Sequence, residues 1–295
     1  MHEKHKGLTR RDFVRGTVGT VLGASILGTN WGSVNAATAR SSMVTVVRDQ
    51  NVLDAGFAVD ATGLQKMLEQ TLFTCTGQKN SKDAWLSLVT PDDIIGLVPT
   101  DHLNPTHREV IDAVKKSLMD VGIPKENIVM AQGGPSRPKA CTALIALPAL
   151  KAHWLTGIGT VLKNYIQYSG SPSSYHKENS AKLGEIWNLP EVKGKTKLVL
   201  VDALYPLCDK GPQPDPRYQW AYNGLIAGID PVAVETLCLR ILTEKRQALR
   251  GEPWPLSPPP LCVEAADTVY GLGTSNMAEI SIEQVGWDQD LLFSA

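Results

Sequence analysis

The feature that most constrains the fold is an alternation of short apolar runs with segments of helical periodicity, which continues along most of the chain. The clearest apolar runs are ALIALPAL at residues 143–150 and TKLVLVDAL at residues 196–204. The clearest helix is predicted over residues 104–122, with Asn104 as its cap and Pro105 at its first position. Such alternation predicts an α/β domain with a largely parallel sheet. We expect helices on both faces of this sheet, which makes a three-layer sandwich.

The remaining segments follow the same pattern. A strand followed by a helix is predicted over residues 223–245, with Asp230 as the helix cap and Pro231 at the first helical position. Further predicted elements are strands over 42–49, 127–133 and 281–287, one or two strands within 84–99, and a helix over 60–74.

The N-terminal region has the order of parts that is typical of an export signal. Residues 17–29 are apolar, uncharged and rich in glycine, but they are too few to span a bilayer, which takes about 20 residues. Small residues follow, and the pattern at Val34 and Ala36 predicts cleavage after Ala36. We therefore assign residues 1–36 to a signal peptide, with retention as an N-terminal anchor as the alternative, and residues 37–295 to a single α/β domain.

The basic part of this signal is specific. Thr9, Arg10, Arg11 and Phe13 fill the places of the Ser/Thr-Arg-Arg-x-Phe core, so the segment resembles a twin-arginine (Tat) signal. That resemblance implies the Tat export machinery as a partner, export of the folded protein, and a periplasmic or extracellular location. Folding before export often accompanies a cofactor loaded in the cytoplasm, although fast folding alone would also require this route.

Charge and cysteine usage exclude several classes of protein. The whole chain has 29 Lys and Arg against 30 Asp and Glu. Removal of residues 1–36 leaves 24 and 28, a net charge near −4. This balance gives no sign of nucleic-acid binding, which needs a basic surface. No later apolar run is long enough to cross a membrane.

The five cysteines are scattered, and no two of them are close in sequence. The Cys-x-x-Cys spacing of iron–sulfur and zinc sites is absent, so we expect no iron–sulfur cluster. The sequence leaves open whether another metal or an organic cofactor is bound.

The densest group of polar residues lies in KAHWLTGIGTVLKNYIQYSG, residues 151–170, directly after an apolar strand. Open α/β sheets bind ligands beyond the carboxyl ends of their strands. Gly157 and Gly159 would present backbone amides to an anion, or they would simply form a tight turn. The side chains of interest here are Lys151, His153, Lys163 and Asn164, to which His176, Asp202 and Asn223 are added from later segments. Each of them alone also has an ordinary structural explanation.

These residues carry a family resemblance. The Lys-x-His segment at 151–153, the Lys-Asn pair at 163–164, the strand ending at Asp202 and the Asn223-to-Asp230 stretch resemble the domain-of-unknown-function family 362. His176 matches the later histidine of that family. The likeness covers about residues 90–287. Two departures stand out, because Glu235 replaces an aspartate and the ferredoxin-type cysteine motifs of many relatives are missing.

Taken together, these observations predict an exported enzyme that acts on a small anionic, carboxylate-like molecule. Lys151, Asn164 and the backbone amides would hold the anion, while His153, Lys163 and His176 would take part in catalysis. Two lysines in one pocket repel each other, so either an anionic ligand or Asp202 is expected between them. One alternative is a non-catalytic exported protein that binds a metal or ligand. The other is an isomerase, because the motif is faintly similar to nickel-cofactor lactate racemases.

Overall fold

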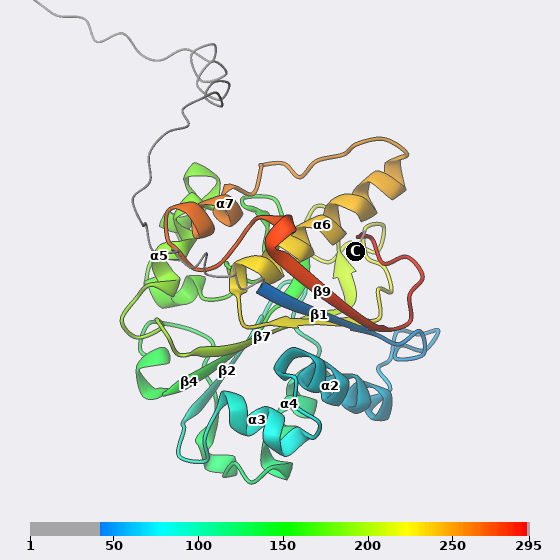
Figure 1. The fold of residues 1–295 in the computed structure, drawn as a ribbon. Helices are drawn as coiled ribbons and strands as arrows, with labels where there is room; N and C mark the ends of the chain where they lie inside the picture. The colour runs from blue at the N-terminus through cyan, green and yellow to red at the C-terminus, as the bar shows by residue number, and fades with distance from the viewer. Residues whose placement is uncertain (1–41, 294–295) are drawn as a thin grey trace, which may run out of the picture. The chain divides into compact units, whose positions relative to one another are not determined.

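The computed structural model describes residues 42–293, which fall within one compact unit (Figure 1). Its centre is a sheet with the strand order β3-β2-β4-β7-β8-β1-β9, to which β5 and β6 are added beside β7. The strands are β1 (Ser42–Arg48), β2 (Ile95–Pro99), β3 (Ile128–Met130), β4 (Ala143–Leu147), β5 (Ala149–His153), β6 (Gly157–Ile158), β7 (Thr196–Leu207), β8 (Gly224–Gly228) and β9 (Ile280–Gly286). The helices are α2 (Ala61–Thr76), α3 (Ser81–Leu88), α4 (Arg108–Asp120), α5 (Gly184–Trp187), α6 (Pro231–Arg250) and α7 (Leu261–Thr268).

Most neighbouring strands in this sheet are parallel. The pairs β1–β9, β2–β3, β2–β4, β4–β7 and β5–β7 are parallel. Only β8 runs against both of its neighbours, β1 and β7, and β6 folds back antiparallel on β5. The prediction of an α/β domain with a largely parallel sheet is therefore confirmed.

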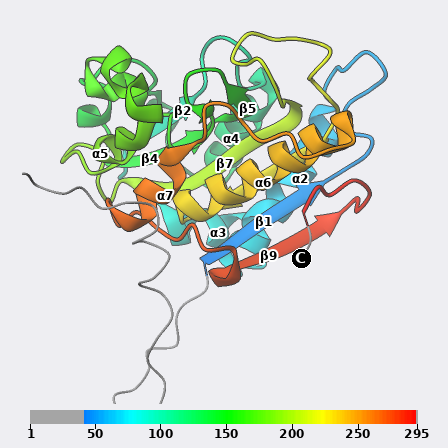
Figure 2. The same ribbon diagram turned by 90° about the horizontal axis from the view of Figure 1, so that it is seen from above.

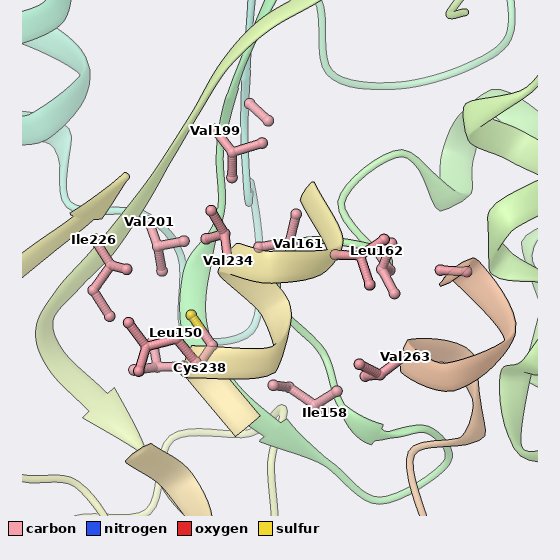
Figure 3. Close-up of a cluster of buried hydrophobic side chains, with 14 of the residues drawn as sticks. Leu150, Ile158, Val161, Leu162, Val199, Val201, Ile226, Val234, Cys238 and Val263 are labelled. Carbon is pink, nitrogen blue, oxygen red and sulfur yellow. The ribbon is translucent and has the colours of Figure 1, made fainter. Parts of the chain in front are cut away.

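Buried side chains form two cores, one on each face of the sheet. Along β7, Val199 and Val201 join the core that contains α6 and α7, whereas Leu198 and Leu200 join the core that contains α2, α3 and α4. This split follows from the two-residue period of a strand. Figures 1 and 2 show the same separation, with α6 and α7 on one side of the sheet and α2 on the other. Figure 3 shows the first core around Val234 and Cys238 of α6.

Two predicted elements differ from the structure. One or two strands are predicted within residues 84–99, but only Ile95–Pro99 form a strand there. Ser81–Leu88 form helix α3, whose first turn is capped by the Asn80 side chain. The apolar run in this segment is too short for its period to separate a strand from a helix. Only Ala84 and Trp85 of α3 are buried.

Helix α4 begins later than predicted. Asn104 does not cap it, because Asn104 takes a left-handed conformation with φ of 64° and the helix starts at Arg108. The side chain of Asp202, on β7, accepts the backbone N–H of His107 instead. The residue that satisfies this amide is thus 95 positions away in the sequence.

The residues of the predicted export signal, Arg10, Arg11, Phe13 and Ala36, lie outside the described residues. Within residues 42–293, no helix combines the length and the apolar character that a bilayer crossing needs.

Candidate functional site

Strand β5 places the first two candidate residues side by side. Lys151 and His153 are two positions apart in the strand, so their side chains leave the same face. Both residues are buried, with 4% and 6% exposure. The carboxyl end of β5 therefore presents one amine and one imidazole to a common space.

The hairpin from β5 to β6 returns the chain to this place. Gly159 donates its backbone N–H to Lys151 O at 2.9 Å, and Lys151 N donates to Thr160 Oγ1 at 3.1 Å. A Cβ at Gly159 would lie 3.0 Å from the Cβ of His153, so a larger residue would crowd the imidazole. The turn over residues 160–164 then carries Lys163 and Asn164 to the same opening.

A buried acid holds this turn. Glu235, on α6, is fully buried and accepts the backbone N–H groups of Val161 at 2.8 Å and Leu162 at 3.3 Å. Burial raises its pKa to about 7, although the two amides act in the opposite direction. Figure 3 shows the side chains of Val161 and Leu162 beside α6. Asn164 completes the anchoring by donating Nδ2 to Val98 O at 2.7 Å.

These side chains line a pocket with a volume of about 320 Å³. Its cationic and proton-transferring groups are Lys151, Lys163, His102, His153 and His176, and Asn164 also lines it. Among the described residues that line it, Asp101 is the only acid. Asp101 is exposed and already contacts Nδ1 of His102. The interior of the pocket therefore favours a negative charge.

Lys151 is held by the backbone of the loop that follows β2. Its Nζ donates to Leu103 O at 2.9 Å and to Asn104 O at 3.0 Å. Burial lowers the pKa of Lys151 to about 7, helped by the nearby charge of Lys163 and opposed by Asp101 and Asp202. Near neutral pH this lysine thus exists in both its charged and its neutral form.

Lys163 is the group that lacks a partner. Within residues 42–293, its ammonium has neither a hydrogen-bond acceptor nor an ion-pair partner. The side chain is partly buried, and this burial lowers its pKa to about 8. A partly buried ammonium without an acceptor is costly for the protein. A ligand oxygen would satisfy it.

The two histidines lie against each other. The rings of His153 and His176 are stacked, with centroids 5.5 Å apart. Burial, Lys163 and His176 together lower the pKa of His153 to about 3, and burial and Lys163 also lower the pKa of His176. Nδ1 of His153 accepts the backbone N–H of Leu155 at 3.1 Å. A neutral ring that accepts at Nδ1 carries its proton on Nε2, so His153 can donate a hydrogen bond to a ligand.

Of the two partners expected between the lysines, an anionic ligand or Asp202, the carboxylate of Asp202 is already bound elsewhere. Asp202 is buried and accepts from His107 Nδ1 and from His107 N, both at 2.7 Å. Asp202 and His107 together line a separate pocket, next to Tyr205 and Gln219. Burial lowers the pKa of His107, but the hydrogen bond and charge of Asp202 outweigh it, so that the pKa is raised overall. The helix predicted over residues 104–122 includes His107 in its first turn and gives it no role in a site.

Three more predicted ligand groups have structural roles. Gly157 has a φ of 77°, and a Cβ there would lie 2.5 Å from Pro258 O, so this glycine serves the tight turn. The N–H of Gly159 is used within the hairpin, and Glu235 occupies the next free amides. Asn223 is also left-handed, with a φ of 58°, and donates to Gln50 O away from the pocket. The backbone N–H groups of Gly159, Val161 and Leu162 are therefore already bound within the protein.

The lining of the pocket includes two residues, Trp154 and Gln132, that are not among the candidates predicted from the sequence. Trp154 is 59% exposed at the rim, directly after His153. Gln132 lines the pocket with an Oε1 that is buried without a hydrogen-bond partner among the described residues. Their positions depend on loops that meet only in the folded chain.

Metal ligands are not clustered among the described residues. Between residues 42 and 293, no group of three or more His, Cys, Asp or Glu side chains is arranged to hold one. The five cysteines are buried and free of disulfides.

The fold and the pocket define an α/β protein with a pocket lined by Lys151 and Lys163. Residues 103–240 match the model of the family described as Domain of unknown function (DUF362). The matched segment contains Lys151, His153, Lys163, Asn164, His176 and Glu235. Comparison with curated proteins and comparison with solved structures gave no match.

Proposed function

We propose that this pocket binds a small carboxylate-like anion and that the protein acts on that molecule as an enzyme. The observation that carries the proposal is the ammonium of Lys163, which points to no acceptor of the described chain while it lies in one pocket with Lys151. A carboxylate would pair with Lys163 and would also relieve the repulsion between the two lysines.

The proton-transferring groups in the pocket support an enzyme. The pKa of Lys151 is about 7, so its amine can take up and release a proton near neutral pH. His153 is neutral and can donate a hydrogen bond from Nε2 to an oxygen of the bound molecule. Asn164 lines the same pocket, and because its Nδ2 donates to Val98 O, its carboxamide oxygen would serve as the acceptor for a ligand hydroxyl.

Binding is tested by titration calorimetry with lactate and malate, with lactamide as the uncharged analogue of lactate. We expect the two anions to bind and lactamide not to bind, because only the anions satisfy Lys163. Lys163→Met should remove the binding, whereas Lys66→Met, at an exposed position on α2, should leave it unchanged. Equal affinity of Lys163→Met and the wild type for these anions would refute the proposal.

Turnover separates an enzyme from a binding protein. Incubation of bound L-lactate in heavy water, followed by NMR, detects exchange of the C2 proton, as an isomerase similar to lactate racemases would cause. Lys163-dependent binding together with recovery of every tested anion intact would instead support the non-catalytic alternative.

We also propose that the protein is exported in folded form by the twin-arginine route to the periplasm or beyond. This rests on the Thr9-to-Phe13 motif and on the apolar segment that follows it. The buried Glu235 and the two cores that surround the sheet are consistent with a domain that folds as one unit before transport.

A further inference from the structure

The environment of Lys151 is unusual for a residue that only holds an anion. Its side chain is 96% buried, and Nζ donates to two backbone carbonyls, Leu103 O and Asn104 O. Both acceptors belong to consecutive residues in left-handed conformations, with φ of 52° and 64°. Such backbone is costly for residues other than glycine, so this loop is held in place by the rest of the fold. Lys151 thus has fixed acceptors for two of its hydrogens.

These two hydrogen bonds fix the direction of the lone pair when the amine of Lys151 is neutral. A neutral amine has two N–H groups and one lone pair, and here the two carbonyls take both N–H groups. The lone pair then points to a remaining tetrahedral position of Nζ. Since Lys151 lines the pocket, we take that position to be open to a bound molecule.

The surrounding charges favour the neutral amine. Lys163 lies close enough to disfavour the charged form, and no carboxylate makes an ion pair with Lys151 among the described residues. Asp101 and Asp202 act on it only from a distance, and Asp202 is already bound to His107. Burial together with a neighbouring cation is the arrangement that turns a lysine into a nucleophile.

We propose that Lys151 is the nucleophile of this pocket and that it forms an imine with a small 2-oxo acid whose carboxylate is bound by Lys163. This inference rests on the proposed function, because it requires the anion site at Lys163. It changes the role of Lys151 from a ligand-binding cation to a catalytic residue, and it narrows the substrate class to carboxylates with an adjacent carbonyl group.

The chemical step balances without another reactant. The lone pair of Nζ forms a bond to the carbonyl carbon, and the carbonyl oxygen takes one amine hydrogen to become a hydroxyl. That hydroxyl then leaves with the second amine hydrogen as water, and a carbon–nitrogen double bond remains. Both hydrogen bonds from Nζ, to Leu103 O and Asn104 O, break in the course of these two proton transfers. His153 can donate its Nε2–H to the oxygen during the addition.

The test is reductive trapping on the intact chain. Protein is incubated with glyoxylate or pyruvate and cyanoborohydride, and the product is analysed by intact mass and peptide mapping. We expect one adduct per chain, located on Lys151. Lys151→Arg keeps a positive charge but cannot form an imine, so it should give no adduct. Thermal unfolding checks that this variant is folded, and mapping of the wild-type adduct does not depend on it.

Two further variants complete the design. Lys163→Met should reduce trapping by about tenfold or more, because the carboxylate loses a charge-assisted hydrogen bond. Lys177→Met is a matched control, since Lys177 is exposed next to His176 but outside the pocket lining, and it should trap like the wild type.

Binding of lactate, which has the carboxylate but no carbonyl, separates the two proposals. Lys163-dependent lactate binding without a Lys151 adduct would overturn the imine and leave the anion site intact. An adduct spread over exposed lysines, and unchanged in Lys151→Arg, would overturn it as well. If neither lactate nor the 2-oxo acids bind, both proposals fail.

Discussion

Replacing Lys163 with methionine should stabilise the ligand-free protein, although the residue lies in the proposed binding site. Methionine keeps an unbranched side chain of similar length and removes the charge. Burial lowers the pKa of Lys163 from 10.5 to about 8 without any compensating partner. This difference corresponds to a penalty of about 3 kcal/mol for the charged form in the folded protein. The variant should gain an unfolding free energy of that order near neutral pH.

The gain has a defined pH dependence. A lysine whose pKa is depressed in the folded state costs most below its folded pKa of about 8, where it is charged in both states. The cost disappears as the pH rises toward 10.5, because the unfolded lysine then loses its proton as well. The difference between variant and wild type should therefore shrink to about 1 kcal/mol near pH 10.

Urea unfolding measures this difference at both pH values. The buffer must contain no carboxylate or phosphate, because a bound anion would stabilise only the wild type. The control is Lys66→Met, which should change the unfolding free energy by less than about 0.5 kcal/mol at an exposed helix position. A Lys163→Met variant that is less stable than the wild type near neutral pH, or whose gain does not vary with pH, would refute the reasoning.

Three further predictions concern other parts of the chain. His107→Gln should lower the unfolding free energy most at about pH 5 and least at about pH 9. The raised pKa of His107 means that its ion pair with Asp202 stabilises the fold at low pH, and this stabilisation is lost as the pH rises through the pKa in the folded protein. Equal losses of unfolding free energy in urea at both pH values would contradict this. The wild-type unfolding free energy should fall by about 3 kcal/mol between about pH 4.5 and 7, because the pKa of the buried Glu235 carboxyl is raised to about 7 in the folded protein. Glu235→Gln should not show this fall. Thermal stability that depends on pH with the same slope in both proteins would count against this prediction. Changing Arg10 and Arg11 together to lysine should leave the precursor in the cytoplasm, as fractionation would show, and normal export of this double variant would exclude the twin-arginine route.

The strand and helix pattern could be predicted where elements are long or have local signals. Asp230 and Pro231 mark the start of α6, and Asp230 indeed accepts the backbone N–H groups of Val232 and Ala233. The start of α4 could not be predicted in the same way, because Asn104 and Pro105 resemble a helix start that the structure does not use. The group that binds the first amide there is Asp202, on a strand far away in sequence.

The candidate site, too, could be predicted from the sequence only in part. Lys151 and His153 could be placed together because the period of a strand fixes their common face. The joining of Lys163 and Asn164 to them depends on the β5–β6 hairpin and on the contact of Glu235 with the turn. Spacing alone does not show that Asp202 pairs with His107 or that Glu235 binds the backbone N–H groups of Val161 and Leu162. Both result from contacts between distant segments.

A crystal structure of the protein grown with lactate tests the central claim most directly. We predict a carboxylate in the pocket with one oxygen about 2.8 Å from Lys163 Nζ, the distance of a charge-assisted hydrogen bond. The same crystals should show Lys163, His153 and Asn164 around one ligand. An empty pocket at saturating lactate, or a carboxylate bound away from Lys163, would contradict the account.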